Sequence, residues 1–278
     1  MAVNTDIIGK RVDGEPFAYT EDTAILYALG IGADINDLSF IYEKDLKVYP
    51  TFAVVPMLPA LMATFETANL NLFAVLHGEQ EIIMHQPLPP SATINTSSIV
   101  TSIYDKGDKG AVVNLETRHT DDHGILLFET RLSIMDRSGG NFGGERGPKA
   151  EKYDPPEEKS PDFEISYQTS KNQAALYRLS GDKNPLHIDP EFAKLGGFET
   201  PILHGLCTYG FAGRAIINSI CEGDPSKLKS FGVRFKNVVF PGETLTTKGW
   251  KIEDKKYIVL TEGGDGRVVL GNGLVKTV

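Results

Sequence analysis

The polar residues most capable of chemistry are concentrated in one short segment of the chain. Asp182, Asn184 and His187 follow one another closely, and His204-Gly205 comes soon after. A carboxylate and an imidazole in one segment can form an acid/base pair for proton transfer. The amide of Asn184 can hold a water molecule. We therefore expect Asp182 and His187 to transfer protons, with Asn184 beside them.

Local signals place this segment in a loop between two short helices. Ser170-x-x-Gln173 has the pattern of a capping box, and Gly181 marks the end of the helix that it opens. Asp189-Pro190 is typical of an N-cap followed by a first-turn proline, and predicts a second short helix that stops at Gly196. A loop held at both ends by helices is a suitable place for catalytic groups.

A long apolar segment follows, from Ile202 to Ile220. It is apolar nearly all round, which predicts a helix buried on most sides. A helix start leaves backbone N–H groups free and carries partial positive charge. Glycine at that point lets a ligand approach the backbone closely. The N–H of Gly205 is therefore the candidate donor to a developing oxyanion.

Structural interpretations compete with these assignments. A run such as Ser180–Pro185 is common in plain turns. Asp189 is explained as a cap, and His204 is interpreted as a packed, hydrogen-bonded residue at the helix start. Asp182 and His187 alone supply too few ligands for a metal ion, so no metal site is expected. The other histidines have no paired acid close by in the sequence: His77, His85, His119 and His123.

Composition limits the class of protein. Of the 278 residues, 41% are hydrophobic and 23% charged, which predicts a packed core. The net charge of -9 argues against a nucleic-acid partner. Cys207 and Cys221 are too far apart on one helix for a disulfide, and neither belongs to a zinc-binding pair. We expect no secretory signal, no membrane span and no Ser-Lys-Leu-type peroxisomal address at the C-terminus.

The chain divides into two similar halves. Residues 138–160 are rich in Gly and Pro, and predict a linker between a first half, residues 1–137, and a second half, residues 161–278. Shifted back by 150 positions, Leu176-Tyr177 falls on Leu26-Tyr27. Such matches indicate an internal duplication.

Each half shows the same order of elements. A short helix is followed by a loop and by a long apolar helical segment, Val54–Leu76 in the first half. Alternating stretches then predict strands, such as Ala111–Thr117 and Val233–Val239. Turn signals between strands lie at Asp105–Gly107, Asp122–Gly124 and Gly263–Gly266. One buried helix with hairpin strands in each half predicts an α+β fold in which a curved antiparallel sheet wraps the helix.

The second half carries a long motif, SGDKNPLHIDPEFAKLGGFETPILHGLCTYG. This run resembles the signature of the hydratase 2 family, the (R)-specific MaoC-like enoyl-CoA hydratases, and in particular the hydratase 2 domains of peroxisomal type 2 multifunctional enzymes. Further matches make the resemblance nearly full length. They are Phe40–Glu43, Leu76–Gln80, Pro87–Pro89, Asp105–Gly107 and Ser138–Gly144.

The resemblance implies a double hot-dog fold, two halves that each have a long central helix wrapped by an antiparallel sheet. It implies addition of water to a trans-2-enoyl-CoA, giving the (3R)-3-hydroxyacyl-CoA of fatty acid beta-oxidation, with no cofactor, in a homodimer and in the peroxisome. The implied catalytic residues are Asp182, His187, Asn184 and Gly205. The implied contacts along the substrate and CoA path are His77, Gly78, Lys106, Lys183, Pro185, Leu186 and Phe235. Lys106 is equally interpreted as a solvated hairpin tip.

The first half lacks the catalytic side chains. At the offset of 150 Asp182 falls on Gly32, which cannot transfer a proton, and His187 falls on Asp37. We therefore predict one active site per chain, in the second half, and a first half that houses the acyl chain. Pro56 and Pro59 should delay or bend the helix there and open an apolar tunnel. A filled core is the alternative.

Three other functions stay open at this stage. A thioesterase would hydrolyse the thioester, an acyl-binding module would bind without turnover, and a dehydratase could act on acyl-carrier-protein substrates. The residues also do not decide which of Asp182 and His187 serves the water and which serves C2. Acyl chain length is equally open.

Overall fold

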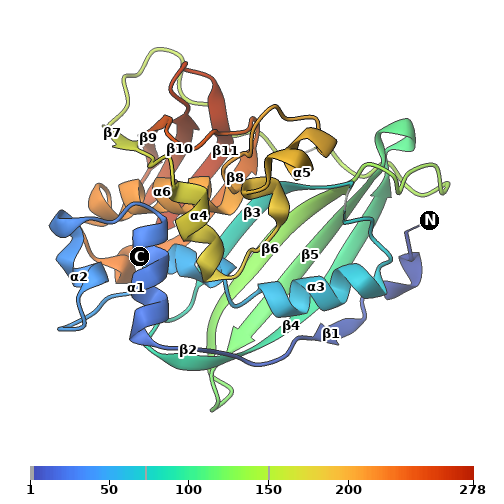
Figure 1. Cartoon of the computed structure of the whole chain (residues 1–278), viewed down its shortest axis with the longest axis horizontal. Coiled ribbons are helices and arrows are strands. Elements are labelled where there is room, and N and C mark those ends of the chain that lie inside the picture. The colour runs from blue at the N-terminus through green and yellow to red at the C-terminus, as the bar shows by residue number, and fades with distance from the viewer. Residues whose placement is uncertain (1–2, 73, 150) are drawn as a thin grey trace.

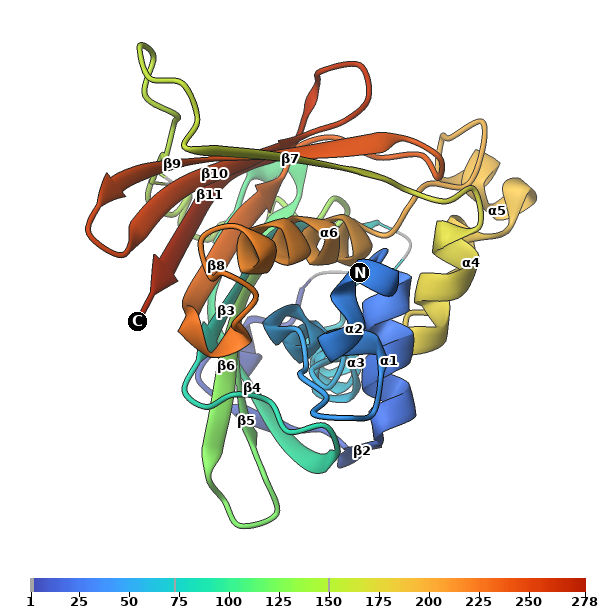
Figure 2. The ribbon, with the colours of Figure 1, turned by 90° about the vertical axis from the view of Figure 1, so that its left-hand side faces the viewer.

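The computed structural model describes residues 3–72, 74–149 and 151–278. Within them, 11 antiparallel strands form one continuous sheet in the order β1-β4-β5-β6-β3-β8-β11-β10-β9-β7, with β2 paired to β4. The sheet curls around its helices (Figure 2). No helix among these residues is long and apolar enough to cross a membrane.

The first half supplies strands with alternating burial, as the period of two requires. The turns between β4, β5 and β6 fall at the predicted sites, Asp105–Gly107 and Asp122–Gly124. The strands are β1 (Arg11–Asp13), β2 (Phe17–Tyr19), β3 (Val75–Met84), β4 (Ala92–Asp105), β5 (Ala111–Thr120) and β6 (Leu126–Asp136).

The second half continues the sheet. Its strands are β7 (Phe163–Gln168), β8 (Leu228–Phe235), β9 (Thr244–Glu253), β10 (Lys256–Glu262) and β11 (Val268–Thr277). The predicted strand Val233–Val239 was too long. It ends at Phe235, because the carbonyl of Val239 accepts a hydrogen bond from the N–H of Leu203 instead of pairing within the sheet. The residues after Phe235 thus bind the chain just before the buried helix of the second half.

The two halves meet edge to edge where β3 pairs with β8. The register runs from Glu79 opposite Arg234 to Ile83 opposite Ser230. The guanidinium of Arg234 also forms an ion pair with Glu79 across this seam. The halves are therefore joined by backbone hydrogen bonds as well as by the chain.

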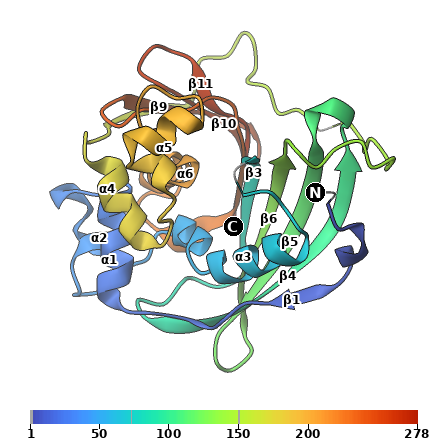
Figure 3. The same ribbon diagram turned by 45° about the vertical axis from the view of Figure 1, so that its right-hand side comes forward.

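The predicted buried helix of the second half is confirmed as α6 (Gly205–Asn218), with the sheet around it (Figure 3). All its residues from Leu206 to Ile217 are buried. Its small residues allow the first half to pack closely. A Cβ at Gly210 would lie 2.3 Å from Cγ2 of Ile31, and one at Gly213 would lie 2.4 Å from Cγ2 of Thr51.

The long helix predicted for the first half was wrong in length. A 3-10 turn, η3 (Pro50–Val54), ends at the first residue of the predicted segment, and the α-helix α3 covers only Leu58–Thr67. Proline has no N–H to donate and its ring disrupts the preceding turn. Pro59 is therefore tolerated in the first turn of α3, whereas Pro56 lies outside it.

Short helices bring the halves together and frame the loop of interest. The predicted helix before Gly181 is α4 (Gln173–Tyr177), extended by the 3-10 turn η5 (Arg178–Ser180), and it packs on α1 (Glu21–Gly30) (Figure 1). The predicted helix after Asp189 is α5 (Pro190–Leu195). The remaining helices and 3-10 turns are η1 (Thr5–Ile7), η2 (Ile35–Asp37), α2 (Leu38–Ile41), η4 (Gly107–Lys109), η6 (Pro185–His187) and η7 (Pro225–Lys227).

A buried ion pair also connects the halves. Arg214 of α6 donates to the carboxylate of Asp37 in η2, at 2.6 Å through Nη2 and 3.0 Å through Nε. Only 5% of either side chain is exposed. The Asp37 carboxylate also accepts from Asn218 at 3.0 Å and from the hydroxyl of Tyr49 at 3.3 Å. Several hydrogen bonds thus compensate the Asp37 carboxylate for its burial.

The Gly-rich segment predicted as a linker has no regular structure among its described residues, yet it is anchored. The carboxylate of Asp105 accepts hydrogen bonds from the backbone N–H groups of Gly107, Asn141 and Gly143, at 2.7 to 2.9 Å. These bonds, led by that from Gly107, lower the pKa of Asp105 to about 2. Asp105 therefore pins the segment to the β4–β5 turn.

Candidate active site

The loop that carries Asp182 and His187 is held by its own side chains. It begins at Gly181, whose φ of +136° suits glycine. The Asp182 carboxylate accepts from the N–H of Asn184 at 3.1 Å, and the Asn184 side chain accepts from the N–H of Leu186 at 3.0 Å. These two Asx turns lead the chain into η6, so that His187 is presented at a fixed place.

The ring of His187 has a defined tautomer. Its Nδ1 lies 2.9 Å from the carbonyl oxygen of Ile202, which can only accept, so Nδ1 carries the proton. Nε2 is then left with a lone pair. Burial lowers the pKa of His187, opposed by the Ile202 carbonyl and the charge of Asp182. The ring is therefore a neutral base at physiological pH.

His204 lies against both members of this pair. Its ring stacks on that of His187, with centroids 3.7 Å apart and planes inclined by 28°. Its Nε2 donates to the backbone carbonyl of Asp182 at 3.2 Å. Burial, and then the proximity of His187, lower the pKa of His204 to about 3. The predicted packed, hydrogen-bonded residue at the helix start is thus confirmed.

Gly205 is the first residue of α6 and is exposed. Within the part of the chain that the structure describes, its backbone N–H has no backbone acceptor. A Cβ at Gly205 would lie 3.1 Å from the ring of Phe235. Glycine thus lets an aromatic ring lie beside a free N–H at the positive end of a helix.

A β-bulge brings His77 to the same place. The register of β3 against β6 shifts between His77 and Glu79, which leaves Gly78 as the extra residue. The ring of His77 lies 4.9 Å from that of Phe235, centroid to centroid. Burial lowers its pKa to about 4, against the carbonyl of Glu79 and the charge of Asp182. His77 thus lies within electrostatic reach of Asp182.

The structure does not bring Lys106 into this cluster. Its Nζ contacts the carbonyl of Arg146 and lies 5.3 Å from the centroid of the Tyr104 ring. It follows β4, three strands from His77 along one edge of the sheet. At about 4.8 Å per strand that is on the order of 14 Å. Of the other predicted contacts, Lys183 and Pro185 are exposed and Leu186 is half-buried.

The first half contributes apolar side chains beside the catalytic loop that the sequence did not identify. A Cβ at Gly181 would lie 3.1 Å from Cδ1 of Leu58 and 4.0 Å from Cγ1 of Val55. Behind His204, the ring of Tyr177 lies at 5.0 Å, and that of Tyr27 lies 6.0 Å further on. Leu58 has no chemical signature; its position between two prolines is the one sign that could have drawn attention to it.

Asp182, His187 and His204 each place one potential ligand atom within 4.8 Å of the others. An imidazole nitrogen binds a metal ion in the plane of its ring. The in-plane lone pairs of two stacked rings do not point at one common ion. Both rings would have to turn before the group could hold one ion. The arrangement favours a hydrogen-bonded acid/base site.

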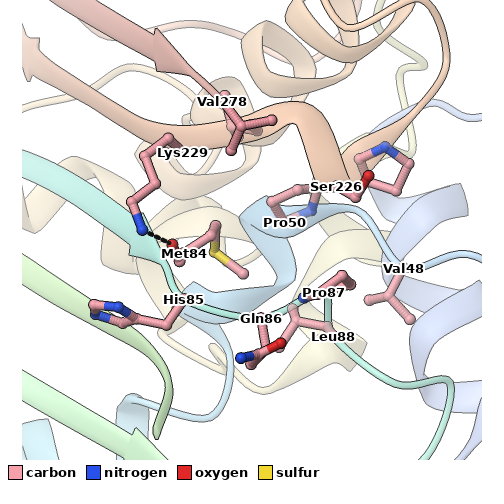
Figure 4. A pocket seen from close by; sticks show the side chains of 12 residues that line it. Val48, Pro50, Met84, His85, Gln86, Pro87, Leu88, Ser226, Lys229 and Val278 are labelled. Carbon is pink, nitrogen blue, oxygen red and sulfur yellow. Dashed lines mark hydrogen bonds between the residues drawn. The ribbon is translucent and has the colours of Figure 1, made fainter.

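A separate surface pocket lies at the opposite end of the β3–β8 seam (Figure 4). Its lining includes Met84 at the end of β3, His85 and Leu88 just after it, and Ser226 and Lys229 near the start of β8. The amino group of Lys229 donates to the carbonyl of Met84 at 2.9 Å. None of the predicted site residues lines it.

Two family descriptions match the chain side by side. Residues 17–138 match the "MFE-2 hydratase 2 N-terminal domain" and residues 152–268 match the "MaoC like domain". The 3-hydroxyacyl-thioester dehydratase Y of Mycobacterium tuberculosis is 41% identical over 100% of this chain and 99% of its own. The chain belongs to the MaoC-like hydratase 2 family. It is accordingly a hydro-lyase.

Other members of this hydratase 2 family are similarly close. A probable enoyl-CoA hydratase 2 of Dictyostelium discoideum is 37% identical over 96% of this chain and 94% of its own. The mouse peroxisomal multifunctional enzyme type 2 is 37% identical over 98% of this chain, which spans 38% of that larger protein.

Solved structures agree on the fold of this hydratase 2 chain. A MaoC-like dehydratase from Phytophthora capsici superposes with a TM-score of 0.87 at 33% identity, covering 99% of both chains. A Mycobacterium tuberculosis protein described as a double hot-dog fold gives a TM-score of 0.60 at 13% identity, covering 98% of this chain and 96% of its own. The predicted double hot-dog fold is confirmed.

Proposed function

We propose that this chain is an (R)-specific 2-enoyl-CoA hydratase, which adds water to trans-2-enoyl-CoA to give (3R)-3-hydroxyacyl-CoA in fatty acid beta-oxidation. The proposal is carried by one observation: the ring of His187, whose Nε2 keeps a free lone pair, lies beside Asp182 and stacks on His204, which immediately precedes the N–H at the start of α6. Family membership supports the substrate class and the stereochemistry.

The tautomer favours His187 as the base. Its Nε2 takes a proton from water as the oxygen attacks C3, and the Asp182 carboxylate stabilises the imidazolium that forms. The π electrons move toward the thioester oxygen, giving an enolate. The same proton then passes to C2 as the enolate collapses, so that the elements of one water molecule are added. Asp182 and His187 share this proton network, and Asn184 orients the water.

The enolate oxygen needs a donor that is already in place. We assign the N–H of Gly205, at the positive end of α6, to this role; removal of one such donor costs about 10²- to 10³-fold in rate in other enzymes. The proposed contacts with substrate and CoA are His77, Gly78, Lys106, Lys183, Pro185, Leu186 and Phe235. Lys106, three strands away from His77, would contact CoA at a distance from the reacting carbons.

We assign catalysis to residues 161–278 and housing of the acyl chain to residues 1–137. The proximity of Leu58 to Gly181 supports this division, since it places the first half directly beside the catalytic loop. A peroxisomal setting belongs to the same proposal and is supported by the peroxisomal relatives. A homodimer is proposed with it from the family resemblance alone.

The test is a hydration assay with trans-2-enoyl-CoAs of graded length. We expect loss of the conjugated chromophore without release of free thiol, and a product oxidised by a dehydrogenase specific for (3R)-3-hydroxyacyl-CoA. Asp182→Asn and His187→Ala should each lose at least about 10²-fold in kcat while remaining folded. Thiol release would indicate a thioesterase, and near-normal kcat in either variant would refute the assigned roles.

The reverse reaction is also expected. The name of the mycobacterial relative describes a dehydratase, and a hydro-lyase catalyses both directions. A comparison of CoA and acyl-carrier-protein thioesters as substrates decides which carrier this chain uses.

A further inference from the structure

His204 has no part in the proton transfers described above, yet it contacts both groups that carry them out. Its ring covers one face of His187, and its Nε2–H holds the backbone carbonyl of Asp182. It also immediately precedes Gly205, the proposed oxyanion donor. A single buried side chain, 1% exposed, thus touches three parts of the site.

The surroundings of the two ring nitrogens keep His204 neutral. Because Nε2 donates to a carbonyl, Nδ1 carries the lone pair in the neutral ring. Nδ1 is buried and has no protein partner among the described residues. Protonation would place an unpaired N–H in this interior, at the cost of its desolvation. His204 therefore stays neutral, and it cannot pass a proton to the substrate.

We propose that His204 is a positioning residue, which fixes the Asp182 backbone through its Nε2–H and keeps water from one face of His187 through its ring. This inference rests on the proposed hydratase function. The two contributions are separable, because one depends on a donor atom and the other on a flat apolar face.

Two substitutions separate them. His204→Phe keeps an aromatic face and loses the donor. We expect kcat to fall roughly 2- to 10-fold, the range of one neutral hydrogen bond, with KM and the pKa of His187 unchanged. His204→Gln keeps an amide N–H near the place of Nε2 and loses the ring. Water then reaches His187, and its pKa should rise toward the ordinary histidine value.

The first half offers a matched control. His119 is also fully buried and stacks on Phe128, with centroids 4.0 Å apart. Its nitrogens bond the hydroxyls of Thr96 and Thr117, and burial lowers its pKa to about 3. His119→Phe should therefore lower the unfolding temperature without changing kcat or the pKa of His187.

The pKa of His187 is best read by NMR titration of its ring protons, which does not depend on turnover. A wild-type protein without hydratase activity would refute the proposed function. The NMR titration of His187 would still test the role of His204 in that case. Wild-type kcat in a folded His204→Phe, or an unmoved His187 pKa in His204→Gln, would overturn the proposal. The other ionisable groups that act on His187 or His204 are unchanged in both variants: Asp182 and Arg178. Tyr177, whose ring lies 5.0 Å from that of His204, is unchanged as well.

Discussion

The buried ion pair between Arg214 and Asp37 gives a prediction about how firmly the halves are joined. Arg214→Met removes the guanidinium and leaves the Asp37 carboxylate buried, with Asn218, Tyr49 and the backbone N–H of Asp34 as its remaining donors. Removing one partner of a buried pair costs about 3–5 kcal/mol, because the other charge is left uncompensated. At 2–4 °C per kcal/mol, we expect a fall in Tm of about 6–20 °C.

The magnitude is tested by thermal unfolding followed by circular dichroism, with two comparisons. Arg214→Met/Asp37→Leu should recover part of the loss, because no unpaired buried charge remains. Recovery is partial because Tyr49, Asn218 and the backbone N–H of Asp34 lose their acceptor. Lys194→Ala breaks an exposed pair, with side chains 60% and 81% exposed, and should cost no more than about 1 kcal/mol. If Arg214→Met lowers Tm no more than Lys194→Ala does, the reasoning is refuted.

Four further predictions concern the site and its surroundings. The base form of His187 is needed, and its pKa is lowered, so kcat/KM should hold through the ordinary histidine range and fall only at lower pH. Asp105→Asn should lower Tm at neutral pH and remove a pH dependence of stability that wild type shows as pH falls from the ordinary Asp pKa through about 2. Ala63→Phe, on the partly exposed side of α3, should reduce activity on long enoyl-CoAs selectively, whereas equal loss at all lengths would contradict acyl housing in the first half. Light scattering at micromolar concentration should give the mass of a dimer, and a monomer mass would reject that part of the proposal.

Much of the second half was predictable because its signals are local. The all-round apolarity of α6, the cap at Asp189 and the glycine at 181 each act within a few residues. In the first half, Pro56 and Pro59 predicted a delayed helix start, and α3 begins only at Leu58. Its end at Thr67 was not predicted, because the apolar segment continues to Leu76.

The site itself combines residues that no local pattern connects. Asp182 and His187 share a loop, but Phe235 ends β8 and His77 precedes a bulge in β3. Only the resemblance to a family placed these two beside the loop in advance. The stacking of His204 on His187 could not be foreseen, because it depends on how the start of α6 meets the turn after α4.

The β3–β8 seam has a consequence for how the protein is made. Glu79 and Arg234, which face each other across it, are 155 residues apart in the sequence. At 5–20 residues per second, the ribosome needs roughly 8–30 s to supply the partner strand after β3 has emerged. During that time β3 presents an unpaired edge that another nascent chain could pair with. Correct assembly therefore depends on shielding that edge, by a chaperone or by transient local structure, until synthesis reaches β8.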